Sequence, residues 1–187
     1  MKAIRLIALA ACMAATLDAA AQEQEIRLFS HRGGRMEHDE NTLSAFQASY
    51  DAGYRGFETD IRMTRDGALV ITHDSSLERT TNGTGTVEEK TEAEIRQLAT
   101  KQGNKMMFLD ELLEFLKGKE GLYVEFEMKT KPEVLYPEER LHAYCDKLYD
   151  AVMAVKPADA TFVFTSGDYR GLRYPVSYTH LRAHETC

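Results

Sequence analysis

The stretch Gly56–Asp74, GFETDIRMTRDGALVITHD, restricts the possible folds more than any other part of the chain. Glu58 and Asp60 are two residues apart in a run of strand-forming residues, and because side chains alternate across a strand, both carboxylates point to one face. A turn at residues 65–67 leads into a second, apolar strand that ends at His73. Two carboxylates on one face, followed by a histidine at the tip of a buried strand, suit a metal site beside a proton-transfer group better than a hydrophobic core.

The rest of the chain alternates between strand and helix patterns. The expected strands are 26–30, 56–64, 69–72, 122–129 and 160–165, and the expected helices are 41–52, 91–99, 109–117 and 138–155. Residues 75–105 are rich in turn-forming residues and are interpreted as an excursion over the rim of the fold. Such alternation favours an α/β protein with a parallel sheet of about five strands and helices outside it.

Polar residues gather at the predicted strand ends. In β/α barrels, chemistry is located at the carboxyl-terminal ends of the strands. The residues at these ends are His31 and Arg32 on the first strand, Glu58 and Asp60 on the second, His73 on the third, and Glu127 and Lys129 on the fourth. We therefore expect all of them on one rim.

Glu58, Asp60 and Glu127 would place three negative charges in one cavity, which is costly unless a cation compensates them. An all-oxygen ligand set favours one hard divalent cation, Ca²⁺ or Mg²⁺, over zinc. Glu125 is a competing ligand one layer below Glu127. The alternative is that these acids only form ion pairs with basic neighbours, namely Arg62, Arg65 or Lys129.

The remaining rim residues suit proton transfer and anion binding. His31 and His73 can act as a general base and a general acid near neutral pH. Arg32 and Lys129 can hold an anion that bridges to the metal, and a phosphate diester fits this arrangement. The other histidines are interpreted as surface or helix residues: His38, His142, His180 and His184.

Composition indicates one soluble globular domain. The chain has 187 residues, a net charge of -7 and no basic run, which argues against a nucleic-acid partner. Residues 1–21 have the pattern of a secretory signal peptide. The apolar run within them is too short for a stable membrane span, so we expect a periplasmic or secreted protein. The alternative is a lipoprotein anchored through Cys12. The three cysteines imply no disulfide framework.

Five motifs in sequence order resemble the glycerophosphodiester phosphodiesterase family: HRGG, ENT, FETDIRMTRDGALVITHD, RTTNGTG and EMK. The resemblance covers residues 28–168 and implies a TIM barrel in which 75–105 is a small insertion. It also implies the residue roles: His31 and His73 as the catalytic acid/base pair, Glu58, Asp60 and Glu127 as metal ligands, and Arg32 and Lys129 as phosphate contacts.

The resemblance implies hydrolysis of a glycerophosphodiester to glycerol 3-phosphate and an alcohol, with attack by the glycerol 2-hydroxyl as one route. Two alternatives remain. One is a phospholipase-type lyase that releases a cyclic phosphate, and the other is a non-catalytic exported protein that binds phosphoesters.

A complete barrel of this type has eight strands and about 250 residues, whereas only five strands are expected here. We therefore interpret 26–174 as a truncated barrel and expect the 187-residue polypeptide to be inactive or insoluble. Residues 175–187 follow no pattern of the family and resemble the in-frame translation of a transposase adapter, so we expect a foreign tail. The alternative is a genuine variant C-terminus.

Overall fold

The structure is a computed structural model that describes residues 28–176. The predicted signal peptide and residues 177–187 of the predicted tail lie outside this range. One sheet has the strand order β1 (Phe29–His31), β2 (Gly56–Met63), β4 (Tyr123–Met128) and β5 (Thr161–Thr165), all parallel, and β3 (Leu69–Ile71) pairs with β2. The prediction of an α/β fold with five strands is confirmed.

The direction of β3 differs from the expectation, because β3 runs antiparallel to β2. Only residues 64–68 join the two strands, and a parallel pair would need a crossover of about a dozen residues or more. The carbonyl groups of Glu58 and Asp60 accept hydrogen bonds from the amides of Arg32 and Thr72 respectively. Carbonyls two residues apart point to the same edge of a strand, so β3 continues along the edge of β2 that β1 occupies. Since β3 runs back along β2, His73 follows Thr72 at the level of Asp60.

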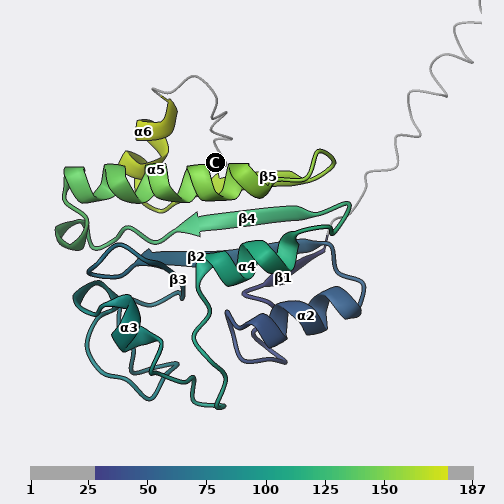
Figure 1. The fold of residues 1–187 in the computed structure, drawn as a ribbon, viewed down its shortest axis with the longest axis horizontal. Coiled ribbons are helices and arrows are strands. Elements are labelled where there is room, and N and C mark those ends of the chain that lie inside the picture. The colour runs from purple at the N-terminus through teal and green to yellow at the C-terminus, as the bar shows by residue number, and fades with distance from the viewer. Residues whose placement is uncertain (1–27, 177–187) are drawn as a thin grey trace, which may run out of the picture.

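Helices α2 (Leu43–Asp51), α4 (Leu109–Leu116) and α5 (Glu138–Val155) pack on one face of the sheet, and α6 (Tyr169–Val176) packs on α5 (Figure 1). The side chain of Thr42 caps α2 by accepting a hydrogen bond from the amide of Ala45. The sheet residues that face these helices are apolar: Phe57, Ile61, Val124, Phe126 and Met128. This face forms the main core, so the functional residues are left on the opposite face.

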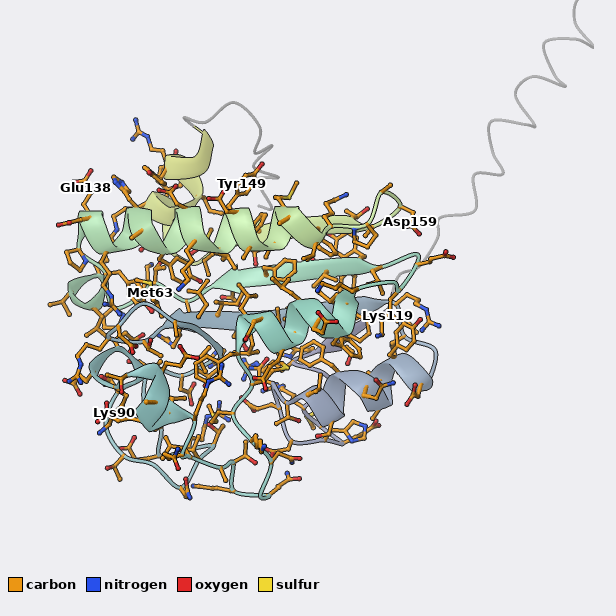
Figure 2. The ribbon with its side chains drawn as sticks, viewed as in Figure 1. Met63, Lys90, Lys119, Glu138, Tyr149 and Asp159 are labelled. Carbon is orange, nitrogen blue, oxygen red and sulfur yellow. The ribbon has the colours of Figure 1, made fainter. Side chains whose placement is uncertain are left out.

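The register between β2 and β4 gathers carboxylates on that opposite face. Glu58 pairs with Glu125 and Asp60 pairs with Glu127, and directly paired residues of neighbouring strands point the same way. Figure 2 shows the two ends of the sheet: Met63 and Glu138 mark the carboxyl-terminal end of β2 and β4, whereas Lys119 and Asp159 mark the opposite end. Asp60 and Glu127 lie toward the first of these ends.

The excursion segment, residues 75–105, packs beside the carboxyl-terminal end of β2 (Figure 1). It contains the 3-10 helix η1 (Val87–Glu89) and helix α3 (Glu92–Ile95), which begins with a capping box formed by Thr91 and Glu94. Helix α3 ends earlier than expected, because Ala99 and Thr100 leave the helix for isolated bridges. A second apolar cluster supports the segment: Val70, Leu77, Val87, Ile95, Met106 and Phe108.

A short 3-10 helix, η2 (Glu133–Leu135), connects β4 to α5. Across residues 28–176, helices are too short or too polar to cross a bilayer.

Replacing Tyr136 with phenylalanine is expected to lower the free energy of unfolding by about 1–3 kcal/mol, the usual cost of leaving buried polar groups short of a partner. Tyr136 is fully buried after η2. Its hydroxyl accepts a hydrogen bond from the amide of Met63 and donates one to the carboxylate of Glu88, both at 3.0 Å. Urea denaturation measures the loss. Tyr169→Phe, at a residue that is 71% exposed, is the control, and equal stability of the two variants would contradict the prediction.

Candidate active site

Three carboxylates from two neighbouring strands meet at the rim. Glu58 and Asp60 come from β2 and Glu127 from β4, and one oxygen of each lies within 4.8 Å of the others. Asp60 is completely buried, Glu58 is buried and Glu127 is half-buried. Within residues 28–176 this is the one group of three acidic, histidine or cysteine side chains spaced in this way, and Glu125 does not belong to it.

The residues present fit a divalent cation. Glu58 Oε1 is buried and makes no hydrogen bond within the described structure, and Asp60 Oδ1 makes none either, although the Lys129 ammonium lies 3.2 Å from it. Burial raises the pKa of Glu58 to about 8, and the neighbouring charges of Asp60 and Glu127 add to this effect. A cation would relieve both the missing contacts and the repulsion. The all-oxygen donor set suits Ca²⁺ or Mg²⁺.

Two basic side chains partly compensate the three acids. The Lys129 ammonium lies 2.6 Å from Glu127 Oε1 and 3.2 Å from Asp60 Oδ1, and Arg32 Nε lies 3.2 Å from Asp60 Oδ2. Two positive charges against three carboxylates leave one negative charge over, which adds to the effect of burial in raising the pKa of Glu58. Arg32 and Lys129, the predicted phosphate contacts, thus lie beside the acids, and the alternative pairing with Lys129 is present.

The alternative pairings with Arg62 and Arg65 are wrong. Arg62 forms a buried ion pair with Glu88 at 2.8 Å, and Arg65 lies 3.6 Å from Glu94. Both partners come from the excursion segment, so neither arginine is available to neutralise the acids at the rim.

The two histidines lie at the same mouth in different surroundings. His31 Nε2 lies 3.5 Å from Glu58 Oε2. Burial lowers the pKa of His31, and the charges of Arg32, Arg35 and His73 lower it further, against a small opposing effect of Asp60. His73 Nδ1 lies 2.5 Å from Asp74 Oδ1, which leaves Nε2 on the other side of the ring.

The carboxylate beside His73 is ionised. Burial alone would raise the pKa of Asp74, but hydrogen bonds from Arg79 and His73 outweigh it and lower that pKa to about 2. A carboxylate on Nδ1 fixes the orientation and tautomer of an imidazole. The structure therefore favours a His73 ring with Nδ1 on Asp74 and Nε2 on the side away from that carboxylate.

Asn41 is a site residue that is absent from the set predicted from the sequence. Its side-chain amide donates a hydrogen bond of 2.9 Å to Asp60 Oδ2, while Thr42 does the capping. Asn41 and Arg32 are also the described non-glycine residues with positive φ, 58° and 54°. Such backbone conformations persist where the surroundings enforce them, often at functional sites. The available signal in the sequence was that two successive residues, Asn41 and Thr42, can each cap the helix although only one cap is needed.

The HRGG motif shapes the loop below Arg32. Gly33 has a φ of 76°, and a Cβ atom there would lie 3.0 Å from Ala45 Cβ and 3.1 Å from the backbone of Phe46. Only glycine allows the loop to pack so closely on α2 and still turn Arg32 toward Asp60.

Without metal, the melting temperature is expected to fall as the pH rises from about 5 to about 8. Unfolded Glu58 titrates near its ordinary value of 4.5, whereas the folded pKa is about 8. The folded state therefore retains a proton that the unfolded state has lost, and the stabilisation present at low pH disappears as the pH passes through the folded pKa. Scanning fluorimetry with a chelator measures this trend.

The matched variant Glu58→Gln should show a flatter pH dependence of the melting temperature. Added Ca²⁺ or Mg²⁺ should protect the unmodified protein more at pH 8 than at pH 6, because cation and proton compete for the same oxygens. Identical pH profiles for the two proteins would contradict the account of Glu58.

Comparison with known proteins gives consistent matches. The family described as "Glycerophosphoryl diester phosphodiesterase family" matches residues 31–174. A curated "Glycerophosphodiester phosphodiesterase" of Caldanaerobacter subterraneus subsp. tengcongensis is 37% identical over 123 residues, which cover 61% of this chain and 50% of that protein. The chain thus spans about half the length of this curated relative.

Two solved structures are similar in fold. A glycerophosphodiester phosphodiesterase from Agrobacterium tumefaciens matches with a TM-score of 0.67 and 27% identity, over 83% of this chain and 64% of that one. An Oleispira antarctica phosphodiesterase, in complex with its product sn-glycerol-3-phosphate, matches with a TM-score of 0.72 and 25% identity, over 82% and 62%. The described strands and helices therefore form part of a barrel of this type.

Proposed function

Because the chain belongs to the glycerophosphoryl diester phosphodiesterase family and has its TIM-barrel fold over the described residues, we propose that the protein translated from its intact gene hydrolyses glycerophosphodiesters. The products are glycerol 3-phosphate and an alcohol. The Oleispira antarctica relative was solved with sn-glycerol-3-phosphate, which supports this substrate class.

The observation that carries the proposal is the convergence of unlike groups at one mouth. Glu58, Asp60 and Glu127 bring oxygens within 4.8 Å of one another, and His31 lies 3.5 Å from the first of them. Hydrolysis of a phosphate diester requires that its negative charge be neutralised and that protons move to and from the reacting oxygens. Acids that hold a cation serve the first need, and an imidazole serves the second.

We assign the three acids to the metal. When bound, a divalent cation would neutralise the phosphate and polarise its phosphorus–oxygen bonds. The side chains of Arg32 and Lys129, which pair with Asp60 and Glu127, would also contact the phosphate oxygens. Asn41 would hold Asp60 in place through its amide, as groups behind a metal ligand commonly do.

The surroundings of the two histidines separate their roles. The lowered pKa of His31 favours a neutral imidazole near neutral pH, so we assign His31 to take the proton of the attacking hydroxyl. The Asp74 carboxylate lies at Nδ1 of His73 and can stabilise a positive charge on the ring, so we assign His73, as an imidazolium, to give its Nε2 proton to the departing alcohol oxygen. Opposite environments for two titratable groups are typical of acid/base pairs.

One assay tests the proposal. The protein translated from the intact gene is incubated with a panel of glycerophosphodiesters, with and without chelator, and the products are followed by phosphorus-31 NMR. Glycerol 3-phosphate as the end product, with loss of turnover in chelator and recovery with Ca²⁺ or Mg²⁺, is expected. A cyclic phosphate as the end product would favour the lyase, and binding without turnover would favour the phosphoester-binding protein.

We also propose export after cleavage following Ala21 and a foreign origin for residues 175–187. Both regions lie largely outside the described residues. N-terminal sequencing of the exported protein should give Gln22 as its first residue. A genomic read that codes for the tail would refute its foreign origin.

A further inference from the structure

The excursion segment contributes an arginine to the rim. Arg79 donates hydrogen bonds from Nη2 and Nη1 to the two carboxylate oxygens of Glu40, at 2.7 and 3.0 Å. Its Nε donates to Asp74 Oδ2. Glu40 lies in the loop before α2, and Asp74 follows β3. One guanidinium thus joins three separate segments of the chain.

This arrangement differs from an ordinary surface ion pair. Exposed pairs contribute little because solvent and salt screen them. Here the contact to Glu40 is bidentate, the side chains of Glu40 and Asp74 are 14% and 26% exposed, and the planar fork of an arginine fixes both acids at defined angles. Each acid has a second contact: Asp74 with His73, and Glu40 with Arg32 at 3.2 Å.

We propose that Arg79 is a positioning residue for His73. Arg79 fixes one oxygen of the Asp74 carboxylate, which leaves the other oxygen facing His73 Nδ1, and the His73 ring is thereby held with Nε2 toward the mouth. Glu40 in turn holds Arg79. The inference rests on the proposed function, because it explains what orients His73, the proposed proton donor.

The backbone of His73 is held by other contacts. Arg62 Nε donates a hydrogen bond of 3.0 Å to the carbonyl oxygen of His73, and the amide of Thr72 donates one to the backbone carbonyl oxygen of Asp60. Leu77, two residues before Arg79, is buried in the second apolar cluster. Removing the guanidinium therefore leaves the strand end and the excursion segment in place, and what it frees is the carboxylate of Asp74 and the ring of His73.

The test compares two esters that differ only in the departing alcohol. An alkyl alcohol such as choline needs a proton as it leaves, whereas p-nitrophenol leaves as a stable anion, so only the first ester depends on a general acid. Arg79→Met should lower kcat for glycerophosphocholine by about 10–100-fold, the scale expected for a misplaced catalytic group. KM for this ester, and both constants for the glycerophosphoryl p-nitrophenyl ester, should stay within about threefold. Arg79→Lys should recover part of the loss.

Arg96→Met is the matched control. Arg96 lies in the same excursion segment, pairs with Glu92 at 2.8 Å and stacks over Phe108, but it has no recorded contact with His73 or Asp74. This variant should keep wild-type constants for both esters. Equal losses for the two esters in Arg79→Met, or no loss for either, would overturn the inference.

A second measurement does not depend on turnover. Nitrogen-15 NMR of the His73 ring should show one tautomer with hydrogen-bonded Nδ1 in the wild type and in Arg96→Met, and averaging of the two tautomers in Arg79→Met. An unchanged ring signal would overturn the positioning role. If the wild type hydrolysed neither ester but the ring signal still differed between the wild type and Arg79→Met, the proposed function would fail and the positioning role would stand.

Discussion

His31→Ala is expected to lower kcat for glycerophosphodiesters by about 10²–10⁴-fold, the range that a positioned general base contributes. The physical reason is the surroundings of the ring: its pKa is lowered by burial and by Arg32 and Arg35, so the neutral imidazole can accept a proton. Metal binding should survive, because the three acids are untouched. Steady-state kinetics and a calorimetric Ca²⁺ or Mg²⁺ titration measure the two effects.

His38→Ala is the control for His31→Ala. His38 lies in the same exposed loop between β1 and α2, and its loss should leave kcat unchanged. Unlike a variant of His73, His31→Ala should slow the alkyl and p-nitrophenyl esters alike, since both need an activated nucleophile. In the wild type, kcat/KM should fall as the pH drops through a pKa below the ordinary 6.5 of histidine. Near-normal kcat for His31→Ala would contradict the assignment.

The sequence predicted the acids at the rim because the relevant rules are local. Alternation in β2 and β4 fixes which residues share a face, and the parallel register aligns Asp60 with Glu127. The two strands lie far apart in sequence, but a βα repeat makes them neighbours. Two short-range patterns and one topological rule were therefore sufficient to bring together the three acids.

The direction of β3 and the role of Asn41 were beyond local rules. An apolar run of three residues has no direction of its own, and the short link to β2 was the overlooked signal for a hairpin. Asn41 could have served as a helix cap, and only the packed position of Asp60 shows that its amide has another partner. Arg79 and Glu40 are 39 residues apart, and no pattern in either segment predicts their contact.

The charges of the site explain why Asp60 is its central residue. Asp60 is fully buried and contacts Arg32, Lys129 and Asn41. It is also the neighbouring charge that contributes most to the raised pKa of Glu58. A change at Asp60 should therefore alter metal affinity, the anion contacts and the titration of Glu58 together, whereas a change at Asn41 should only loosen the orientation of one ligand.

Asp60→Asn is expected to lower divalent-cation affinity by more than about 100-fold, since groups that merely orient a metal ligand already contribute about 10–100-fold. Asn41→Ala, the graded comparison, should fall within that smaller range. Turnover should drop with metal occupancy in both variants. In chelator, Asp60→Asn should also flatten the fall of the melting temperature with pH, because removing the Asp60 charge lowers the pKa of Glu58 toward its ordinary value. Calorimetry and pH-dependent melting measure these effects independently of activity, and wild-type cation affinity in Asp60→Asn would refute the metal site.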